Sequence, residues 1–197
     1  MTRLVLASQS ATRMRLLKAA GIAFTAVAPS VDERAMEVPL ILRHASPAEI
    51  AAALADAKAI DVSESEKDAL VIGADQTLDC DGERWTKPPS LAVAHQQLAR
   101  LSGRTHRLHS AVAVARNGRV AWRYHDGASL TMRPLSAAAI DAYLGEVGDA
   151  ARTSVGAYQV EGPGIRLFER IDGDYFTILG LPLLPLLLYL RGEGAIP

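Results

Sequence analysis

From Leu4 to Gly21 the sequence reads LVLASQSATRMRLLKAAG, and this stretch decides the class of fold. Its first four residues, Leu4 to Ala7, are all apolar, as in a strand that is buried on both faces. The polar Ser8-Gln9-Ser10 follows, and the segment from Ala11 to Ala20 then predicts a helix that Gly21 ends. A buried strand that leads directly into a helix is the repeating unit of α/β proteins.

The rest of the chain continues this alternation. Further strands are predicted at Ala23 to Ala28, at Ala69 to Ala74, and on both sides of the turns Asn117-Gly118 and Asp172-Gly173. Further helices are predicted at Pro47 to Ile60, Ser90 to Leu101, Ser136 to Leu144 and, with Pro182 in its first turn, as a buried terminal helix within Ile178 to Leu190. The charged stretch Ser63 to Asp68 predicts a solvated loop. We therefore expect a single α/β domain over residues 1–197.

The charge composition argues against two classes of partner. The chain has 21 Lys and Arg against 22 Asp and Glu, and so balanced a charge disfavours bulk binding to nucleic acid or to an anionic membrane. Its most apolar segment is too short to span a bilayer and is broken by Pro182 and Pro185. The single cysteine, Cys80, cannot form an internal disulfide, which favours the reducing cytoplasm. Because the overall charge is balanced, any binding of phosphate must depend on a local cluster of cations.

The first candidate for such a cluster is the junction between the first strand and its helix. Hydroxyl groups and free backbone N–H groups at the start of a helix bind anions, and Ser8 lies at this junction. Arg13, one turn further on, adds a bidentate donor. An equally good interpretation makes Ser8 or Ser10 a simple helix cap and Arg13 a surface cation.

The second candidate is Asp75, which directly follows the apolar segment Ala69 to Ala74. Ligands of open α/β sheets bind beyond the carboxyl ends of the strands, so a carboxylate there could hold a metal or activate water. Lys87 follows within a dozen residues and could neutralise phosphate charge. As an isolated pair, however, these residues could be a turn-capping aspartate and a surface lysine.

Glu33, after the second strand, and Lys58, near a helix end, are also open to two interpretations, because Lys58 could simply complement the helix dipole. The histidines indicate no metal site. His106 and His109 would point to opposite faces of a strand. The sequence contains no Gly-Lys-Ser/Thr phosphate loop and no dinucleotide-binding glycine motif after the first strand.

Several blocks of sequence, taken in order, resemble the Maf family of nucleotide pyrophosphatases, also called septum-formation-inhibitor-like proteins. The blocks are LVLASQSATRMRLL at Leu4 to Leu17, VDE at Val31 to Glu33, LADAKA at Leu54 to Ala59, GADQTL and GERWTKP between Gly73 and Pro88, GRTHRLHSAVAV at Gly103 to Val114, and VGAYQVEGPGIRLFERIDGDYFTILGLPL at Val155 to Leu183. The resemblance implies an α/β fold with a mixed sheet and two lobes around a deep cleft, related to inosine triphosphate pyrophosphatases. It also implies a homodimer.

The resemblance implies a role for each candidate residue. Ser8 and Arg13 fall on positions that bind the triphosphate, and Asp75 falls on the position assigned as proton acceptor. Glu33, Lys58 and Lys87 line the same cleft, and Gln159 and Glu161 lie near its nucleotide end. A divalent cation, Mg²⁺ or Mn²⁺, would be held by Asp75 and Glu33, since these hard cations prefer oxygen ligands. The expected substrate is a nucleoside triphosphate, cleaved by water at the α-phosphorus to a monophosphate and pyrophosphate.

Two details point to one branch of the family. The branch that prefers dTTP and UTP usually reads Asp-Thr and Ile-Gln-Gly, whereas this chain has Asp75-Gln76 and Val160-Glu161-Gly162. These residues are more similar to the branch that hydrolyses 7-methyl-GTP, and Glu161 suits the N1–H and exocyclic amine of guanine. Gln76 and Glu161 are therefore expected to contact substrate. The alternatives are a dTTP- or UTP-preferring pyrophosphatase and a non-catalytic nucleotide-binding regulator of cell division.

Overall fold

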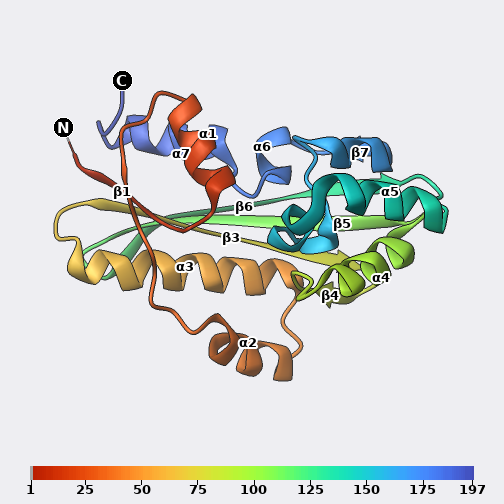
Figure 1. Ribbon diagram of the computed structural model, residues 1–197. Coiled ribbons are helices and arrows are strands. Elements are labelled where there is room, and N and C mark those ends of the chain that lie inside the picture. Colours follow the sequence, from red (N-terminus) through yellow and green to blue (C-terminus); the bar gives the residue numbers. More distant parts are fainter. Residues whose placement is uncertain (1) are drawn as a thin grey trace. The chain divides into compact units, whose positions relative to one another are not determined.

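The computed structural model describes residues 2–197, and its strands and helices alternate along the chain (Figure 1). Parallel and antiparallel strand pairs occur together, so the prediction of an α/β fold with a mixed sheet is confirmed. The chain divides into two compact units. Unit 1 comprises the chain up to Gln76 with His109–Asp126 and Asp174–Pro197, and unit 2 comprises Thr77–Leu108 and Gly127–Gly173. The prediction of one domain with a deep cleft stays a prediction.

The strands are β1 (Leu4–Ala7), β2 (Thr25–Val27), β3 (Leu70–Cys80), β4 (Glu83–Trp85), β5 (Thr105–Arg116), β6 (Arg119–Met132) and β7 (Phe168–Asp172). The α-helices are α1 (Ala11–Ala19), α2 (Glu33–Leu42), α3 (Pro47–Ser65), α4 (Leu91–Leu101), α5 (Ala137–Val147), α6 (Tyr175–Ile178) and α7 (Leu183–Gly192). Short 3-10 helices lie at η1 (Gly148–Thr153), η2 (Val155–Ala157) and η3 (Pro163–Leu167).

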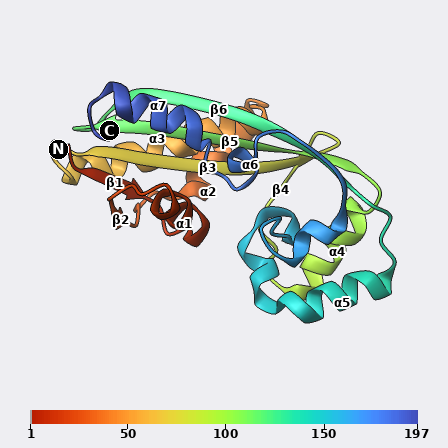
Figure 2. The same cartoon turned by 90° about the horizontal axis from the view of Figure 1, so that it is seen from above.

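The parallel strands of unit 1 form around β1, which is buried along its whole length. It pairs in parallel with β2 on one side and with β3 on the other, and Ala7 lies opposite Gly73 in the second pair. Helix α3 lies on one face of the sheet of unit 1, and α1 and α7 lie on the other, α1 beside β1 and β2 and α7 beside β6 (Figures 1 and 2). Because both faces are covered, the apolar strands need no alternation of polar residues.

Helix α3 approaches the sheet unusually closely, because small residues line the contact. Its alanines pack against alanines of β5, in the cluster Ala51, Ala55, Ala59, Ala111, Ala113 and Ala115. On β3 the contact residue is Gly73, and a Cβ atom placed there would lie 2.3 Å from the backbone oxygen of Ala55. Only glycine fits at that position, and the spacing of α3 from β3 depends on it.

Unit 2 contains antiparallel strand pairs and the helices α4 and α5. Leu78 of β3 pairs with Trp85 of β4 across the Asp81-Gly82 turn, and the end of β6 pairs with β7. Ser90 and Ser136 cap α4 and α5 through their side chains, as the sequence predicts.

The structure corrects three of the predicted elements and adds a helix that was not predicted. Helix α3 continues to Ser65, so the stretch predicted as a solvated loop is partly helical, and Ser63 is fully buried. Its hydroxyl donates to the Ile60 oxygen, which lets a polar residue complete the helix. Helix α2 was not predicted, because Pro39 lies inside it and proline normally interrupts a helix.

The other two corrections concern the C-terminal third of the chain. Asp172-Gly173 connects β7 to α6 and not to another strand, so the predicted hairpin there is wrong. The terminal helix is divided into α6 and α7, and Pro182 is the N-cap of α7, not a residue of its first turn. The hairpin around Asn117-Gly118 is confirmed, since that turn joins β5 to β6.

Candidate active site

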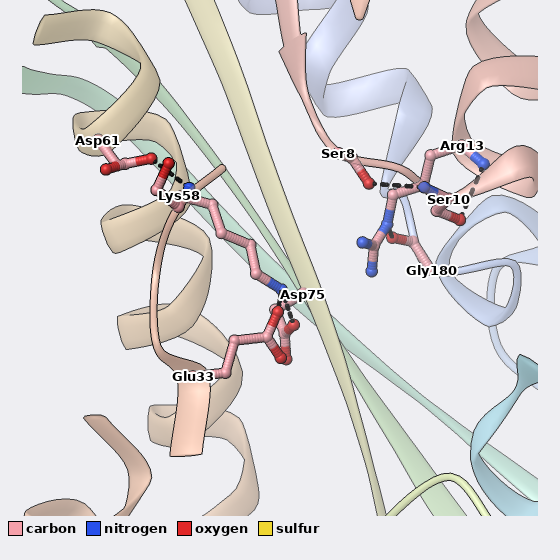
Figure 3. A network of polar contacts seen from close by, with 9 residues as sticks. Ser8, Ser10, Arg13, Glu33, Lys58, Asp61, Asp75 and Gly180 are labelled. Atoms are coloured by element: carbon pink, nitrogen blue, oxygen red, sulfur yellow. Dashed lines mark hydrogen bonds and ion pairs between the residues drawn. The ribbon is translucent and has the colours of Figure 1, made fainter. Parts of the chain in front are cut away.

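Three predicted residues of unit 1 meet in one polar cluster (Figure 3). The Lys58 Nζ atom lies 2.6 Å from Asp75 Oδ1 and 2.8 Å from Glu33 Oε1. Lys58 and Asp75 are both buried, with 6% and 8% of their surfaces exposed, whereas the Glu33 side chain is half exposed. Lys58 therefore does not simply complement a helix dipole, because it forms ion pairs with two carboxylates.

Local sequence explains why each side chain reaches the cluster. Ser46 and Glu49 form a capping box at the start of α3, and the contact at Gly73 sets this helix directly over β3. Asp32 caps α2 by accepting from the Ala35 N–H, which makes Glu33 the first residue of that helix. The resulting cluster thus combines two helices and one strand.

Asp75 is positioned differently from the sequence prediction. It lies inside β3, which continues to Cys80, so it does not follow the carboxyl end of its own strand. It lies instead beyond the carboxyl end of the neighbouring parallel strand, because β1 ends at Ala7 and Ala7 pairs with Gly73. Asp75 therefore does lie beyond the carboxyl end of a parallel strand, as predicted, but that strand is β1 and not its own strand β3.

Burial determines the electrostatics of this carboxyl group. Burial raises the pKa of Asp75 above its usual range, and the charges of Lys58 and Arg13 act against this rise without cancelling it. A carboxylate with a raised pKa is a stronger base than one in water. Among the residues of this cluster, Asp75 is thus the best suited to accept a proton from water near neutral pH.

A second group of polar residues lies at the start of α1 (Figure 3). Ser10 is the helix cap and accepts from the Arg13 N–H, while Ser8 is buried and its Oγ accepts from the Ser10 N–H. The Arg13 Nε donates to the Gly180 oxygen over 2.8 Å. Burial lowers the pKa of Arg13, and the charges of Asp75 and Glu33 oppose that effect. Arg13 is thus not a free surface cation, because its guanidinium is fixed by a backbone oxygen within electrostatic reach of both carboxylates.

Gln76 points away from Asp75, as successive residues of a strand must. Its Nε2 lies 2.9 Å from Ser110 Oγ, 2.9 Å from the Ile178 oxygen and 3.2 Å from the Thr177 oxygen. Gln76 therefore binds the segment around α6, the same segment whose Gly180 orients Arg13. Its predicted contact with substrate stays a prediction.

The other predicted residues belong to unit 2. Lys87 is exposed and follows β4, and Gln159 and Glu161 are partly buried between η2 and η3. The Gln159 Nε2 donates to Thr153 Oγ1 over 2.8 Å. Arg166 and Arg170, the cations that could merely pair with Glu161, form ion pairs with Glu146 and Asp172.

Two contributors to the site were missed in the sequence. Gly180 could have been suspected only as a turn residue before Pro182, because nothing local shows which side chain its oxygen binds. Asp61 lies three residues after Lys58 and accepts the Ser30 N–H, which ties the loop before Glu33 to α3. The spacing of three on one helix was the available signal for Asp61.

The carboxylates of Asp75 and Glu33 provide some, but not all, of the ligands that a hard divalent cation needs. Within residues 2–197, no group of three or more His, Cys, Asp or Glu side chains converges as a complete metal site. Asp75 and Glu33 nevertheless bring two carboxylates to the same ammonium group. Mg²⁺ is commonly bound by one or two carboxylates together with substrate phosphates, so these residues fit a cation that arrives with its substrate.

Sequence comparison places the chain among known proteins. The model of the Maf-like protein family matches residues 3–193. The chain is 56% identical over 194 residues to the 7-methyl-GTP pyrophosphatase of Brucella abortus biovar 1, covering 98% of both chains. It is 55% identical to the 7-methyl-GTP pyrophosphatase of Rhizobium meliloti, covering 98% of this chain and 97% of that one.

A further relative carries a broader name. The nucleoside triphosphate pyrophosphatase of Caulobacter vibrioides is 50% identical, covering 100% of this chain and 98% of that one. Among solved structures, a HAM1 protein from Coxiella burnetii matches with a TM-score of 0.41 and 18% identity, over 67% of this chain and 73% of that one. None of the helices in residues 2–197 has the length and apolar character needed to cross a membrane.

Proposed function

This chain belongs to the Maf-like protein family, and from that premise we propose that it hydrolyses a nucleoside triphosphate, preferentially 7-methyl-GTP, to the monophosphate and pyrophosphate. The observation that carries the proposal is the buried contact of Asp75 with Lys58, beside Glu33 and within reach of the Arg13 charge. Relatives named as pyrophosphatases match the chain over nearly its whole length.

Asp75 is the proposed general base. Its burial raises its pKa, which favours removal of a proton from a water molecule that attacks the α-phosphorus. Lys58, 2.6 Å away, holds the carboxylate in one orientation and is proposed to stabilise the negative charge that develops as the water attacks.

Arg13 is the proposed phosphate ligand of unit 1. Because its Nε is occupied by the Gly180 oxygen, its terminal nitrogens are the donors that can form the paired contact with phosphate oxygens. The start of α1, with Ser8 and the backbone N–H groups beyond it, adds donors for the same anion. Lys87 is proposed to offset the charge on the departing pyrophosphate.

Asp75 and Glu33 would hold the divalent cation, Mg²⁺ or Mn²⁺. Such a cation, when bound, withdraws charge from phosphate oxygens and lowers the pKa of bound water. The half-exposed Glu33 is the carboxylate that can turn most easily between Lys58 and a cation.

The position of cleavage gives the first prediction. With Mg²⁺ or Mn²⁺ present, the protein should release pyrophosphate and a nucleoside monophosphate, and heavy oxygen from labelled water should enter the monophosphate. A substrate with a methylene bridge between the β- and γ-phosphates should still be cleaved, whereas a bridge between the α- and β-phosphates should prevent cleavage. Mass spectrometry of the products measures both. Release of orthophosphate and a nucleoside diphosphate would contradict the proposed mechanism.

Glu161 is the proposed reader of the base. A carboxylate can accept from the N1–H and the exocyclic amine of guanine, and its charge favours the positive ring of the 7-methyl base.

Exchange of this carboxylate gives the second prediction. Wild-type protein should hydrolyse 7-methyl-GTP more efficiently than dTTP or UTP, by roughly tenfold or more, because a wrong base leaves the partly buried Glu161 carboxylate without its hydrogen bonds to the base, at a cost of about 1–3 kcal/mol. In Glu161→Gln the preference should diminish while turnover at saturation changes less. The measurement is kcat/KM for the three nucleotides.

The matched control for this prediction is Glu169→Gln, which removes an exposed carboxylate of the same unit. It should leave the preference unchanged. Faster hydrolysis of dTTP or UTP by the wild-type protein would instead assign the chain to the other substrate preference.

The remaining proposals concern context. We propose a homodimer and a cytoplasmic location, the latter supported by a single, buried Cys80. A non-catalytic regulator of cell division would bind nucleotides without needing a water-activating carboxylate, so hydrolysis that depends on Asp75 separates the two functions.

A further inference from the structure

His106 of β5 is among the most deeply buried polar residues of unit 2, with 1% of its surface exposed. Its Nε2 lies 2.6 Å from the hydroxyl oxygen of Tyr158. Its ring also packs against the rings of Tyr158 and Phe168, with centroids 5.5 and 6.0 Å away. Two sequence blocks far apart in the chain, GRTHRLHSAVAV and VGAYQVEGPG, are thus joined by one hydrogen bond.

Both partners of this bond are neutral at physiological pH. Burial lowers the pKa of His106 to about 4 and raises the pKa of Tyr158 far above its usual value. Within the described chain, the Nδ1 atom of His106 has no hydrogen-bonding partner, so the contact with Tyr158 is the polar interaction that orients the ring. A fixed ring in turn fixes Tyr158 and the backbone beside it.

A second tyrosine holds the same segment from α5. The Tyr143 hydroxyl donates to the Ala157 oxygen over 3.2 Å. Burial raises the pKa of Tyr143 to about 12, although a hydrogen bond with the Gln159 backbone acts against that rise. Tyr143 therefore contacts the backbone on both sides of Tyr158.

The backbone at these contacts is strained at one residue. Gly156 and Ala157 both have positive φ, at 77° and 63°; glycine adopts this conformation readily, whereas alanine seldom does, so the strain lies at Ala157. Gly164 closes the segment from the other side, since a Cβ there would lie 2.5 Å from the Gln159 oxygen. A strained backbone persists only where neighbouring residues stabilise it. Gln159 and Glu161 directly follow this part of the backbone in the chain.

We infer that His106, acting through Tyr158, is a positioning residue for recognition of the nucleobase, and that Tyr143 assists it. Their hydrogen bonds fix the course of the segment 157–161 and with it the direction of Glu161. This inference rests on the proposed function, because it assumes that Glu161 reads the base.

The test compares three variants of the full-length protein. His106→Phe keeps an aromatic ring but removes the hydrogen bond, Tyr158→Phe removes the same bond from the other side, and His106→Gln retains a polar group that can reach Tyr158. Each is assayed for kcat/KM with 7-methyl-GTP and with UTP. The ratio of the two values is independent of how much of a preparation is folded, so a loss of stability does not affect it.

His106→Phe and Tyr158→Phe should each reduce the ratio, by up to about tenfold if one hydrogen bond of Glu161 to the base is lost. The double variant should be no worse than either single one, because both remove one interaction. His106→Gln should recover most of the wild-type ratio, and kcat with 7-methyl-GTP should change less than KM.

An unchanged ratio in both phenylalanine variants, with the wild-type protein still preferring 7-methyl-GTP, would overturn the inference. Equal loss of activity toward both nucleotides would overturn it as well, since that is the effect of a purely structural residue. A wild-type protein with no preference between the nucleotides would contradict the assignment of base reading to Glu161, and the inference would fail together with that assignment.

Discussion

Replacing Asp75 by asparagine is expected to lower kcat by about 10²–10⁴-fold, because the amide keeps the size of the side chain but cannot accept the proton of the attacking water. The loss should be larger if Asp75 also binds the cation. Lys58 keeps its contact with Glu33 in this variant, so the cation of the cluster stays paired. The measurement is pyrophosphate release under saturating 7-methyl-GTP and Mg²⁺.

The stability of the same variant provides an independent check. Burial raises the pKa of Asp75, which means that the ionised carboxylate is costly inside the fold. Asp75→Asn should therefore unfold at a temperature no lower than the wild-type protein, as expected for a residue kept for chemistry. Asp56→Asn, which removes the carboxylate paired with Arg123, is the control and should retain activity. Wild-type turnover in Asp75→Asn would show that the carboxylate is structural.

Adding one methyl group at Gly73 is expected to damage both the fold and the site. The Cβ of Gly73→Ala would lie 2.3 Å from the Ala55 oxygen and 2.6 Å from the Ala59 nitrogen, and these are backbone atoms that a side-chain rotation cannot move. Overpacking of this kind typically costs about 1–3 kcal/mol. Helix α3 must shift, and it carries Lys58. A displacement of about 1 Å can cost roughly 10²-fold in rate.

Thermal unfolding and kcat/KM together test this expectation. Gly145→Ala is the matched control, since nothing lies within 4 Å of a Cβ at that position of α5, and alanine favours a helix. Native stability and activity in Gly73→Ala would show that the contact between α3 and β3 can relax without moving Lys58.

The sequence predicted most elements whose signals are local. The strand at Leu4 to Ala7, the helix after Ser90 and the hairpin at Asn117-Gly118 each carry their own pattern, cap or turn, and all three are confirmed. The missed helix α2 contains Pro39, and the extension of α3 depends on Ser63 satisfying its hydroxyl within the helix. Both segments also pack against the rest of unit 1, since Leu40 of α2 contacts Ile50 and Leu54 of α3 and Ser63 is fully buried, and such packing outweighs local propensity.

The site shows the same limit. Chemistry and family resemblance indicated Asp75, Lys58 and Glu33 separately, but the ion pairs among them depend on the close packing at Gly73, which no local pattern reveals. The role of Gly180 depends on a contact across 167 positions of the chain. Residue types could thus be predicted, whereas their partners required the fold.

The contact between Arg13 and Gly180 also determines when Arg13 becomes oriented during synthesis of the protein. A ribosome releases the chain from its N-terminus, so the residues of β1, α1 and α3 emerge long before Gly180 has been synthesised. In the nascent chain, Arg13 lacks the backbone oxygen that orients it until the stretch Asp174–Pro197 has been synthesised. Translation that stops before Gly180 therefore yields a polypeptide without an oriented Arg13, and the residue that we propose as phosphate ligand is oriented only late in synthesis.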